Sequence, residues 1–156
     1  MTELQCRLIS LADSKEVLDW RNDPVTREMS MNTSVISWND HSEWFSKMLD
    51  SPTRIGFIGE LGGEKIGVVF MHVNKSTAKV SINLNPAHRG KKLAGRFLRK
   101  VMIEVQKLNP KIDQFIAEIK NANTLSAKIF VQNGFVLTVV GDGFSVYNYN
   151  QKGAGV

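Results

Sequence analysis

The chain has little of what would let it rely on covalent or metal cross-links. It contains one cysteine, Cys6, so no internal disulfide can form, and no CxxC pair or His/Cys cluster has the spacing of a zinc site. No apolar run approaches the ~20 residues that a membrane-spanning helix needs, and the first residues lack the apolar segment of a signal peptide. We therefore expect no metal, no membrane association and a protein of the reducing cytoplasm.

What the chain does have is enough apolar residues for a core. With 42% hydrophobic residues in a length of 156, it fits one domain, expected over residues 1–150, followed by a flexible tail at residues 151–156. No repeat, linker or low-complexity segment divides it.

The net charge of +5 suits an anionic partner and is equally compatible with an ordinary basic enzyme. Many of the basic residues gather in one loop and the helix after it, not along a stripe interleaved with aromatic residues as a nucleic-acid groove requires. They are Arg89, Lys91, Lys92, Arg96, Arg99 and Lys100. This clustering favours a focused phosphate site and no nucleic-acid partner.

Hydrophobic periodicity predicts a strand, two helices, three strands, a helix, a strand, a helix and two strands, which make an α+β (α/β) domain on one mixed sheet. Asp13 and Asp40 each precede a glutamate by three residues, as in a capping box, and are expected to start the first two helices; later helices are expected from Ala94 and Asn123. The strands are expected at residues 4–10, 54–61, 65–73, 77–84, 115–119, 135–140 and 144–149. Gly62-Gly63 predicts a tight hairpin, and the uniformly apolar strand 65–73 is expected inside the sheet.

The most informative segment runs from residue 80 to residue 94. An alternating strand leads through a proline-containing basic loop into a long amphipathic helix, so unpaired backbone N–H groups at the helix start can bind an anion. Pyrophosphate is the natural occupant. Arg89, Lys91 and Lys92 add positive charge, and Gly90 and Ala94 keep bulk away from the phosphates.

Two motifs resemble those of the GCN5-related N-acetyltransferases (GNAT). Arg89-Gly-Lys-Lys92-Leu-Ala94 is similar to the acyl-CoA loop Gln/Arg-x-x-Gly-x-Gly/Ala, with Lys92 in place of glycine. The run from Asn123 through Ser126 and Phe130 to Phe135 is similar to the later motif Asn-x-x-Ser/Ala-x-x-Leu-Tyr-x-x-x-Gly-Phe. The resemblance covers the chain except its tail and implies the GNAT fold, a mixed, mostly antiparallel twisted sheet of about seven strands with about four helices.

The resemblance implies that acetyl-CoA is the cofactor and that its acetyl group passes directly to a primary amine. The strand before the loop would bind the pantetheine arm through its backbone, and an amide near Leu84 would bond the thioester oxygen as negative charge develops there. The cofactor-binding set implied is Ile82, Asn83, Leu84, Arg89, Gly90, Lys91, Lys92, Leu93, Ala94, Gly95, Asn123, Ser126 and Phe130.

The residues that transfer protons are not identified by the two motifs alone. The family's usual acid is a tyrosine, and Phe130 stands there, so Ser126, Tyr147 or water would have to substitute. Ser126 is equally well read as a hydroxyl on the helix surface. The candidate bases are Glu60, His72 and Glu118, with a water-relayed base as the alternative.

The acceptor amine is suggested by a pattern near the N-terminus. Trp20-Arg21-Asn22 and His41-Ser-Glu-Trp44 resemble the GNAT branch that acetylates amino-sugar nucleotides, including pseudaminic acid pathway enzymes, and part of the pattern occurs in ribosomal-protein N-terminal acetyltransferases. A nucleotide-linked 4-amino sugar is the leading acceptor; a protein or peptide amine and a catalytically weak acyl-CoA-binding module are the alternatives. A homodimer is left open. Substrate contacts are expected from Arg21, Asn22, His41, Trp44 and Tyr147, with core packing as the other interpretation of the aromatic residues.

Overall fold

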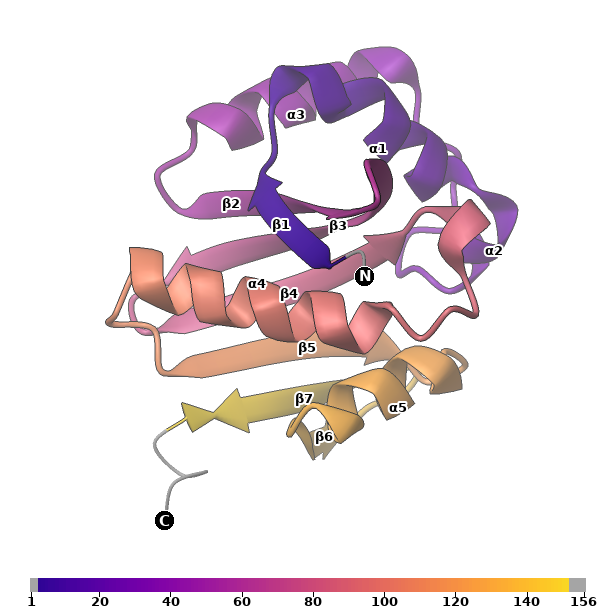
Figure 1. Ribbon diagram of the computed structural model, residues 1–156. Helices are drawn as coiled ribbons and strands as arrows, with labels where there is room; N and C mark the ends of the chain where they lie inside the picture. The colour runs from indigo at the N-terminus through magenta and orange to yellow at the C-terminus, as the bar shows by residue number, and fades with distance from the viewer. Residues whose placement is uncertain (1–2, 152–156) are drawn as a thin grey trace.

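Seven strands form one sheet in the order β1-β2-β3-β4-β5-β7-β6 in the computed structural model, which describes residues 3–151 (Figure 1). All neighbouring strands are antiparallel except β4 and β5, which are parallel. The strands are β1 (Leu4–Leu8), β2 (Arg54–Leu61), β3 (Glu64–Asn74), β4 (Thr77–Leu84), β5 (Gln114–Lys120), β6 (Val136–Val140) and β7 (Phe144–Asn150). The predicted mixed, mostly antiparallel sheet is confirmed, with β3 inside it.

Five α-helices accompany the sheet within residues 3–151, one more than expected: α1 (Ser14–Asn22), α2 (Pro24–Glu28), α3 (Trp38–Asp50), α4 (Ala94–Leu108) and α5 (Thr124–Gln132). Short 3-10 turns, η1 (Leu11–Asp13) and η2 (Pro86–His88), precede α1 and α4. The additional helix is α2. Asp23 caps it by accepting from the N–H groups of Val25 and Thr26, and a proline at the first helical position starts a helix readily.

The helices lie on both faces of the sheet. α4 crosses one face, and α1 and α3 lie on the other (Figure 1). Adjacent residues of β3 show the alternation, because Val69 packs under α4 with Phe97 whereas Val68 packs with Phe45 of α3. The sheet therefore separates two apolar clusters, one on each of its faces.

Asp13 stands at the N-cap position of α1 as predicted, whereas the start predicted at Asp40 is three residues late, because Ser37 is the N-cap of α3. Ser37 caps α3 by accepting a hydrogen bond from the N–H of Asp40, so the helix begins at Trp38. Asp13 makes no side-chain cap to α1; its carboxylate accepts from the N–H of Ser10 and from Arg7. Ser10 is the N-cap residue of the 3-10 turn η1 and not of α1.

The hairpin between β2 and β3 is as predicted. Gly62 and Gly63 have φ angles of 61° and 79°, a conformation that glycine adopts without steric cost. At the other end of the described chain, Gln151 donates from its N–H to the carbonyl of Asp113 at 2.9 Å, so the expected loose tail does not start there. Residues 152–156 of that tail lie outside the described residues.

Among residues 3–151, no helix combines the length and apolar character that crossing a bilayer requires. Within the same residues, no three histidine, cysteine, aspartate or glutamate side chains are grouped so as to hold a metal ion.

Candidate active site

The two parallel strands β4 and β5 separate at the centre of the sheet. They pair only over Thr77 to Lys79 on β4 and Gln114 to Ile116 on β5. From Val80 onward, β4 pairs with β3 on one edge and with no strand of residues 3–151 on the other. The sequence predicted both strands but gave no sign of where they would part. The open edge of β4 can accept an extended ligand as an additional strand.

The direction of the backbone along that edge follows from the β3–β4 ladder. The N–H of Asn85 donates to the carbonyl of Ile66 at 2.8 Å, which identifies a hydrogen-bonded pair. Hydrogen-bonded and non-hydrogen-bonded pairs alternate along an antiparallel ladder, so Asn83 bonds β3 while Ile82 and Leu84 turn their N–H and C=O groups to the open edge. Two of the three positions expected to bind the pantetheine arm thus present free backbone groups.

The loop after β4 presents a run of backbone donors. From Gly90 to Arg96, no N–H group hydrogen bonds to any residue in the described range, and no side chain caps α4. Lys91, Lys92 and Arg96 are exposed there, and the first turn of α4 contains no acidic residue. Unpaired donors, the positive end of a fifteen-residue helix and three cations fit a diphosphate.

Lys92, which stands where the acyl-CoA motif has glycine, has a left-handed backbone with φ of 58°. Non-glycine residues avoid this region, so the backbone keeps the geometry of the motif although the residue is different. Gly90 is also left-handed, at φ 76°, with nothing within 4 Å of a built Cβ. The substitution at Lys92 adds a cation to the loop and leaves its path intact.

Arg89 does not point freely into this loop. One guanidinium nitrogen, Nη2, donates to Asp23 Oδ2 and to Thr26 Oγ1, the latter at 2.6 Å, at the start of α2. The expected role of Arg89 as a phosphate ligand is therefore at odds with the ion pair that the structure shows. Leu93 and Ala94 are buried under the loop, and a Cβ at Gly95 would lie 2.9 Å from Asn133 Nδ2 of α5, so these three residues position the loop against the core.

The second motif divides into surface and core positions. Asn123 caps α5, because its Oδ1 accepts from the N–H of Ser126 at 3.2 Å, and Ser126 is half-buried. Phe130 is 2% exposed and packs edge-on against Phe135 with 4.9 Å between ring centroids. Phe130, which was expected to contact the cofactor, lies in the core, and its apolar ring cannot donate a proton.

The base candidates are dispersed. Glu60 accepts from Arg7 Nε at 2.9 Å at the β1–β2 end of the sheet. His72 is exposed and lies opposite Lys79, five residues from Leu84 along β4, roughly 17 Å at strand spacing. Glu118 is on β5 and pairs with Lys79 Nζ at 3.0 Å. None of the three is brought to the open edge at Leu84 by these contacts, and the water-relayed base stays a prediction.

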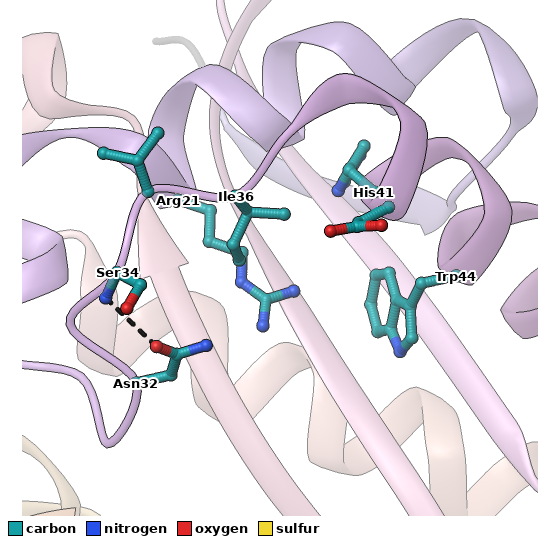
Figure 2. Close-up of a pocket in the computed structure, with 8 residues that line it drawn as sticks. Arg21, Asn32, Ser34, Ile36, His41 and Trp44 are labelled. Atoms are coloured by element: carbon teal, nitrogen blue, oxygen red, sulfur yellow. Dashed lines mark hydrogen bonds between the residues drawn. The ribbon is translucent and has the colours of Figure 1, made fainter.

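A cavity of about 370 Å³ lies on the opposite side of the sheet from α4. Figure 2 shows the Arg21 guanidinium directed into it between Asn32 and Trp44. Trp44 packs edge-on against Phe70, with 5.2 Å between ring centroids, and Phe70 pairs with Ser81 of β4. Trp44, which lines the cavity, is thus linked through Phe70 to β4 at Ser81. Its lining residues are Arg21, Asn32, Ser34, Val35, Ile36, Asp40, His41 and Trp44.

Arg21 and His41 have unused polar atoms in this cavity. Arg21 is half-buried, stacks over Trp44 at 5.4 Å and forms no ion pair or hydrogen bond within residues 3–151; burial lowers its pKa. His41 is 1% exposed, and its Nε2 lies 2.8 Å from the carbonyl of Ser14, so Nε2 carries the hydrogen. Burial lowers the pKa of His41 and leaves the ring neutral, with Nδ1 an acceptor that has no partner among those residues.

The remaining expected substrate residues lie elsewhere. Both side-chain amide atoms of Asn22 are bonded to the backbone of Ile36, so Asn22 holds the cavity wall, and its contact with a substrate stays a prediction. Tyr147 pairs with Ala117 and packs against the α4 cluster, on the sheet face opposite Trp44. Sequence reasoning missed Asp23 and Thr26, for which the Asp-Pro signal of a helix start was available.

Comparison with known proteins adds the family. A model described as "Acetyltransferase (GNAT) domain" matches residues 3–136, most of the chain. The chain belongs to the GNAT family. The expectation of a GNAT acetyltransferase, and with it an acetyl-CoA-dependent N-acetyltransferase, is confirmed at this level. Among curated proteins, none matches the sequence significantly.

Solved structures with the same fold are distant in sequence. A domain from Methanocaldococcus jannaschii is 20% identical with a TM-score of 0.84, over 96% of this chain and 99% of that one. Spermidine N-acetyltransferase from Vibrio cholerae, in complex with CoA and spermine, is 16% identical with a TM-score of 0.84, over 96% of both chains. The aminoglycoside acetyltransferase AAC(6')-Ib with coenzyme A is 16% identical with a TM-score of 0.80, again over 96% of both. These likenesses establish the shared GNAT fold.

Proposed function

We propose that this GNAT protein, acting as a single domain, transfers the acetyl group of acetyl-CoA to the primary amine of a small anionic acceptor, with a nucleotide-linked 4-amino sugar as the leading acceptor. One observation carries the choice of acceptor: the Arg21 guanidinium is half-buried in the cavity and has no carboxylate partner within residues 3–151. A buried cation without a partner favours an anionic ligand.

The cavity offers the other contacts that such an acceptor needs. The Trp44 ring provides an apolar face for a sugar or base, and the side chains of Asn32 and Ser34 offer polar groups to sugar hydroxyls. A polycation such as the spermine bound by the Vibrio cholerae enzyme would bring positive charge close to Arg21, which is unfavourable in a half-buried site.

Acetyl-CoA supplies the acetyl group as a thioester. The residues of this chain bind and orient it: backbone donors from Gly90 to Arg96 hold the diphosphate, and the Leu84 N–H at the open edge of β4 stabilises negative charge on the carbonyl oxygen. Because Phe130 is apolar and buried, the leaving thiol takes its proton from Ser126 or water, and the family's tyrosine acid has no counterpart at this position.

The buried phenylalanine also supports a second candidate function, a catalytically weak acyl-CoA-binding module. We place the protein in the cytoplasm, which agrees with the free thiol of Cys6.

The test is a free-thiol release assay with acetyl-CoA against nucleotide-linked 4-amino sugars, peptides and polyamines. We expect turnover with the sugar nucleotides and, for Arg21→Met, a KM for that acceptor about tenfold higher, since a charged hydrogen bond is lost. Arg21→Lys is the matched control that retains the charge. Turnover confined to peptides or polyamines would refute the acceptor, and CoA binding with no turnover at all would favour the binding module.

A further inference from the structure

Helix α2 lies at the end of the sheet where β4 ends, beside the loop that leads into α4 (Figure 1). It is tied to both strands that separate there. Arg89, just after β4, donates to Asp23 and Thr26 at the start of α2. Lys120, the last residue of β5, donates from Nζ to the carbonyl of Glu28 at the end of α2, at 2.8 Å. The helix therefore bridges the two diverging strands.

The same helix holds the wall of the Arg21 cavity. Arg27 donates from Nε to the carbonyl of Asn22 at 3.1 Å and from Nη1 to the carbonyl of Thr33 at 3.2 Å. Asn22 in turn bonds the backbone of Ile36 twice. A displacement of α2 therefore moves the segment that contains Asn32, Ser34 and Ile36 of the cavity lining.

We propose that Arg89, at the position where the acyl-CoA motif begins, is a positioning residue for the acceptor cavity, acting through Asp23 and α2, and not a ligand of the cofactor diphosphate. Asp23 Oδ2 already accepts from the N–H groups of Val25 and Thr26 at 3.1 Å each, and the guanidinium completes this set. The hydrogen bond from Arg89 lowers the pKa of Asp23. Redirecting Arg89 to a diphosphate would break this charge-assisted pair, whereas Lys92 and Arg96 have no ion pair to break within the described residues.

The first test is calorimetric titration of CoA into Arg89→Met, Asp23→Asn and Arg96→Met. Asparagine remains a good N-cap, so Asp23→Asn removes the charge and keeps the helix start. We expect CoA affinity to stay within about twofold of the wild type for the first two variants and to fall about tenfold for Arg96→Met, the matched arginine in the first turn of α4. A tenfold loss in Arg89→Met with none in Asp23→Asn would overturn the proposal, because it would make Arg89 a diphosphate ligand.

The second test reads the cavity wall without any acceptor. Amide hydrogen exchange at Ile36 should become faster to the same extent in Arg89→Met and Asp23→Asn. The double variant should exchange at the same rate as either single variant, because both changes break one interaction. Exchange in β2 and β3 should stay unchanged. Unchanged exchange at Ile36 in both variants would refute the coupling.

The third test rests on the proposed function. With the acceptor identified by the thiol assay, both variants should raise the KM for the acceptor about tenfold and leave the KM for acetyl-CoA and kcat close to the wild type. An increase in the KM for acetyl-CoA instead would contradict it. Because the calorimetric and exchange tests need no acceptor, failure of the proposed function and failure of this inference are distinguishable.

Discussion

Asn22 and Ile36, fourteen residues apart, are joined by two hydrogen bonds that close the wall of the acceptor cavity. Asn22 Nδ2 donates to the carbonyl of Ile36 at 2.8 Å, and the N–H of Ile36 donates to Asn22 Oδ1 at 2.9 Å. Asn22, which was expected to bind substrate, holds the backbone of a residue that lines the cavity.

Removing this pair should loosen the cavity and lower stability. We expect Asn22→Ala to reduce the free energy of unfolding by about 1–2 kcal/mol, because two half-buried backbone groups lose their partners. Urea unfolding measures the loss. Asn22→Asp is the matched variant: it retains the acceptor for the N–H of Ile36 and should lose less at low pH, where a protonated carboxyl can also donate. Equal stability of Asn22→Ala and the wild type would show that the two hydrogen bonds between Asn22 and Ile36 do not stabilise the protein in solution.

Lys92 has a backbone conformation that suits glycine. Lys92→Gly should raise the free energy of unfolding by about 1 kcal/mol, since glycine reaches φ of 58° without steric cost. It should also weaken CoA binding by loss of the cation. Lys75 between β3 and β4 has φ of 57° and lies far from the loop in the sequence, so Lys75→Gly should match the gain in stability without changing CoA affinity. Thermal unfolding and CoA calorimetry on both variants check this, and a destabilised Lys92→Gly would contradict the assigned conformation.

Gly67 on β3 allows the close approach of β4 at Leu84. A Cβ at Gly67 would lie 2.7 Å from the carbonyl oxygen of Asn83 and 3.1 Å from Leu84 Cα, so Gly67→Ala must push β4 out of place. Because displacing a catalytic group by about 1 Å can cost up to a hundredfold in rate, we expect kcat to fall by at least about tenfold.

The control for Gly67 is Gly56→Ala on β2. A Cβ there would meet only the side chains of Ile9 and Phe70 among the nearest atoms, and it lies away from the open edge. It is expected to lower stability with a smaller effect on kcat. A fall in kcat of equal size in both variants at equal folded fraction would mean that the position of Leu84 does not control the rate.

Asp13 makes folding stability depend on acid. Burial raises its pKa, but hydrogen bonds from Arg7 and Lys65 and from the N–H of Ser10 outweigh burial and hold the pKa well below the usual range. A carboxyl with a lowered pKa stabilises the fold fully above its unfolded value of about 3.9, and this contribution is lost as the pH falls further.

The matching variant is Asp13→Asn. It should lower the free energy of unfolding by about 3 kcal/mol at pH 7, since Arg7 and Lys65 lose a carboxylate that is 1% exposed, and by clearly less only near pH 2, well below the unfolded pKa of about 3.9. Urea unfolding at the two pH values measures the difference. An equal loss at both would show that the ion pairs do not stabilise the protein.

Periodicity predicted the long elements well and the contacts between distant segments poorly. The helix from Ala94 and the strands around Gly62-Gly63 follow from a repeating apolar pattern and a turn that only glycine favours. The bridge from Arg89 to Asp23 spans 66 residues, and no local signal contains such a pairing. For the same reason the motifs did not predict the hydrogen bonds of Asn22 to Ile36 or the burial of Phe130, because a motif gives positions and only packing shows what each one contacts.

We infer that the backbone donors from Gly90 to Arg96 hold the diphosphate of acetyl-CoA. The most direct measurement is amide NMR of the protein titrated with CoA and, separately, with inorganic pyrophosphate. We expect both ligands to cause their largest chemical-shift changes at the amides of Gly90 to Arg96. Only CoA should also shift the amide signals of Ile82 and Leu84. Saturating CoA that leaves these amides unmoved, or that shifts another part of the chain instead, would contradict it.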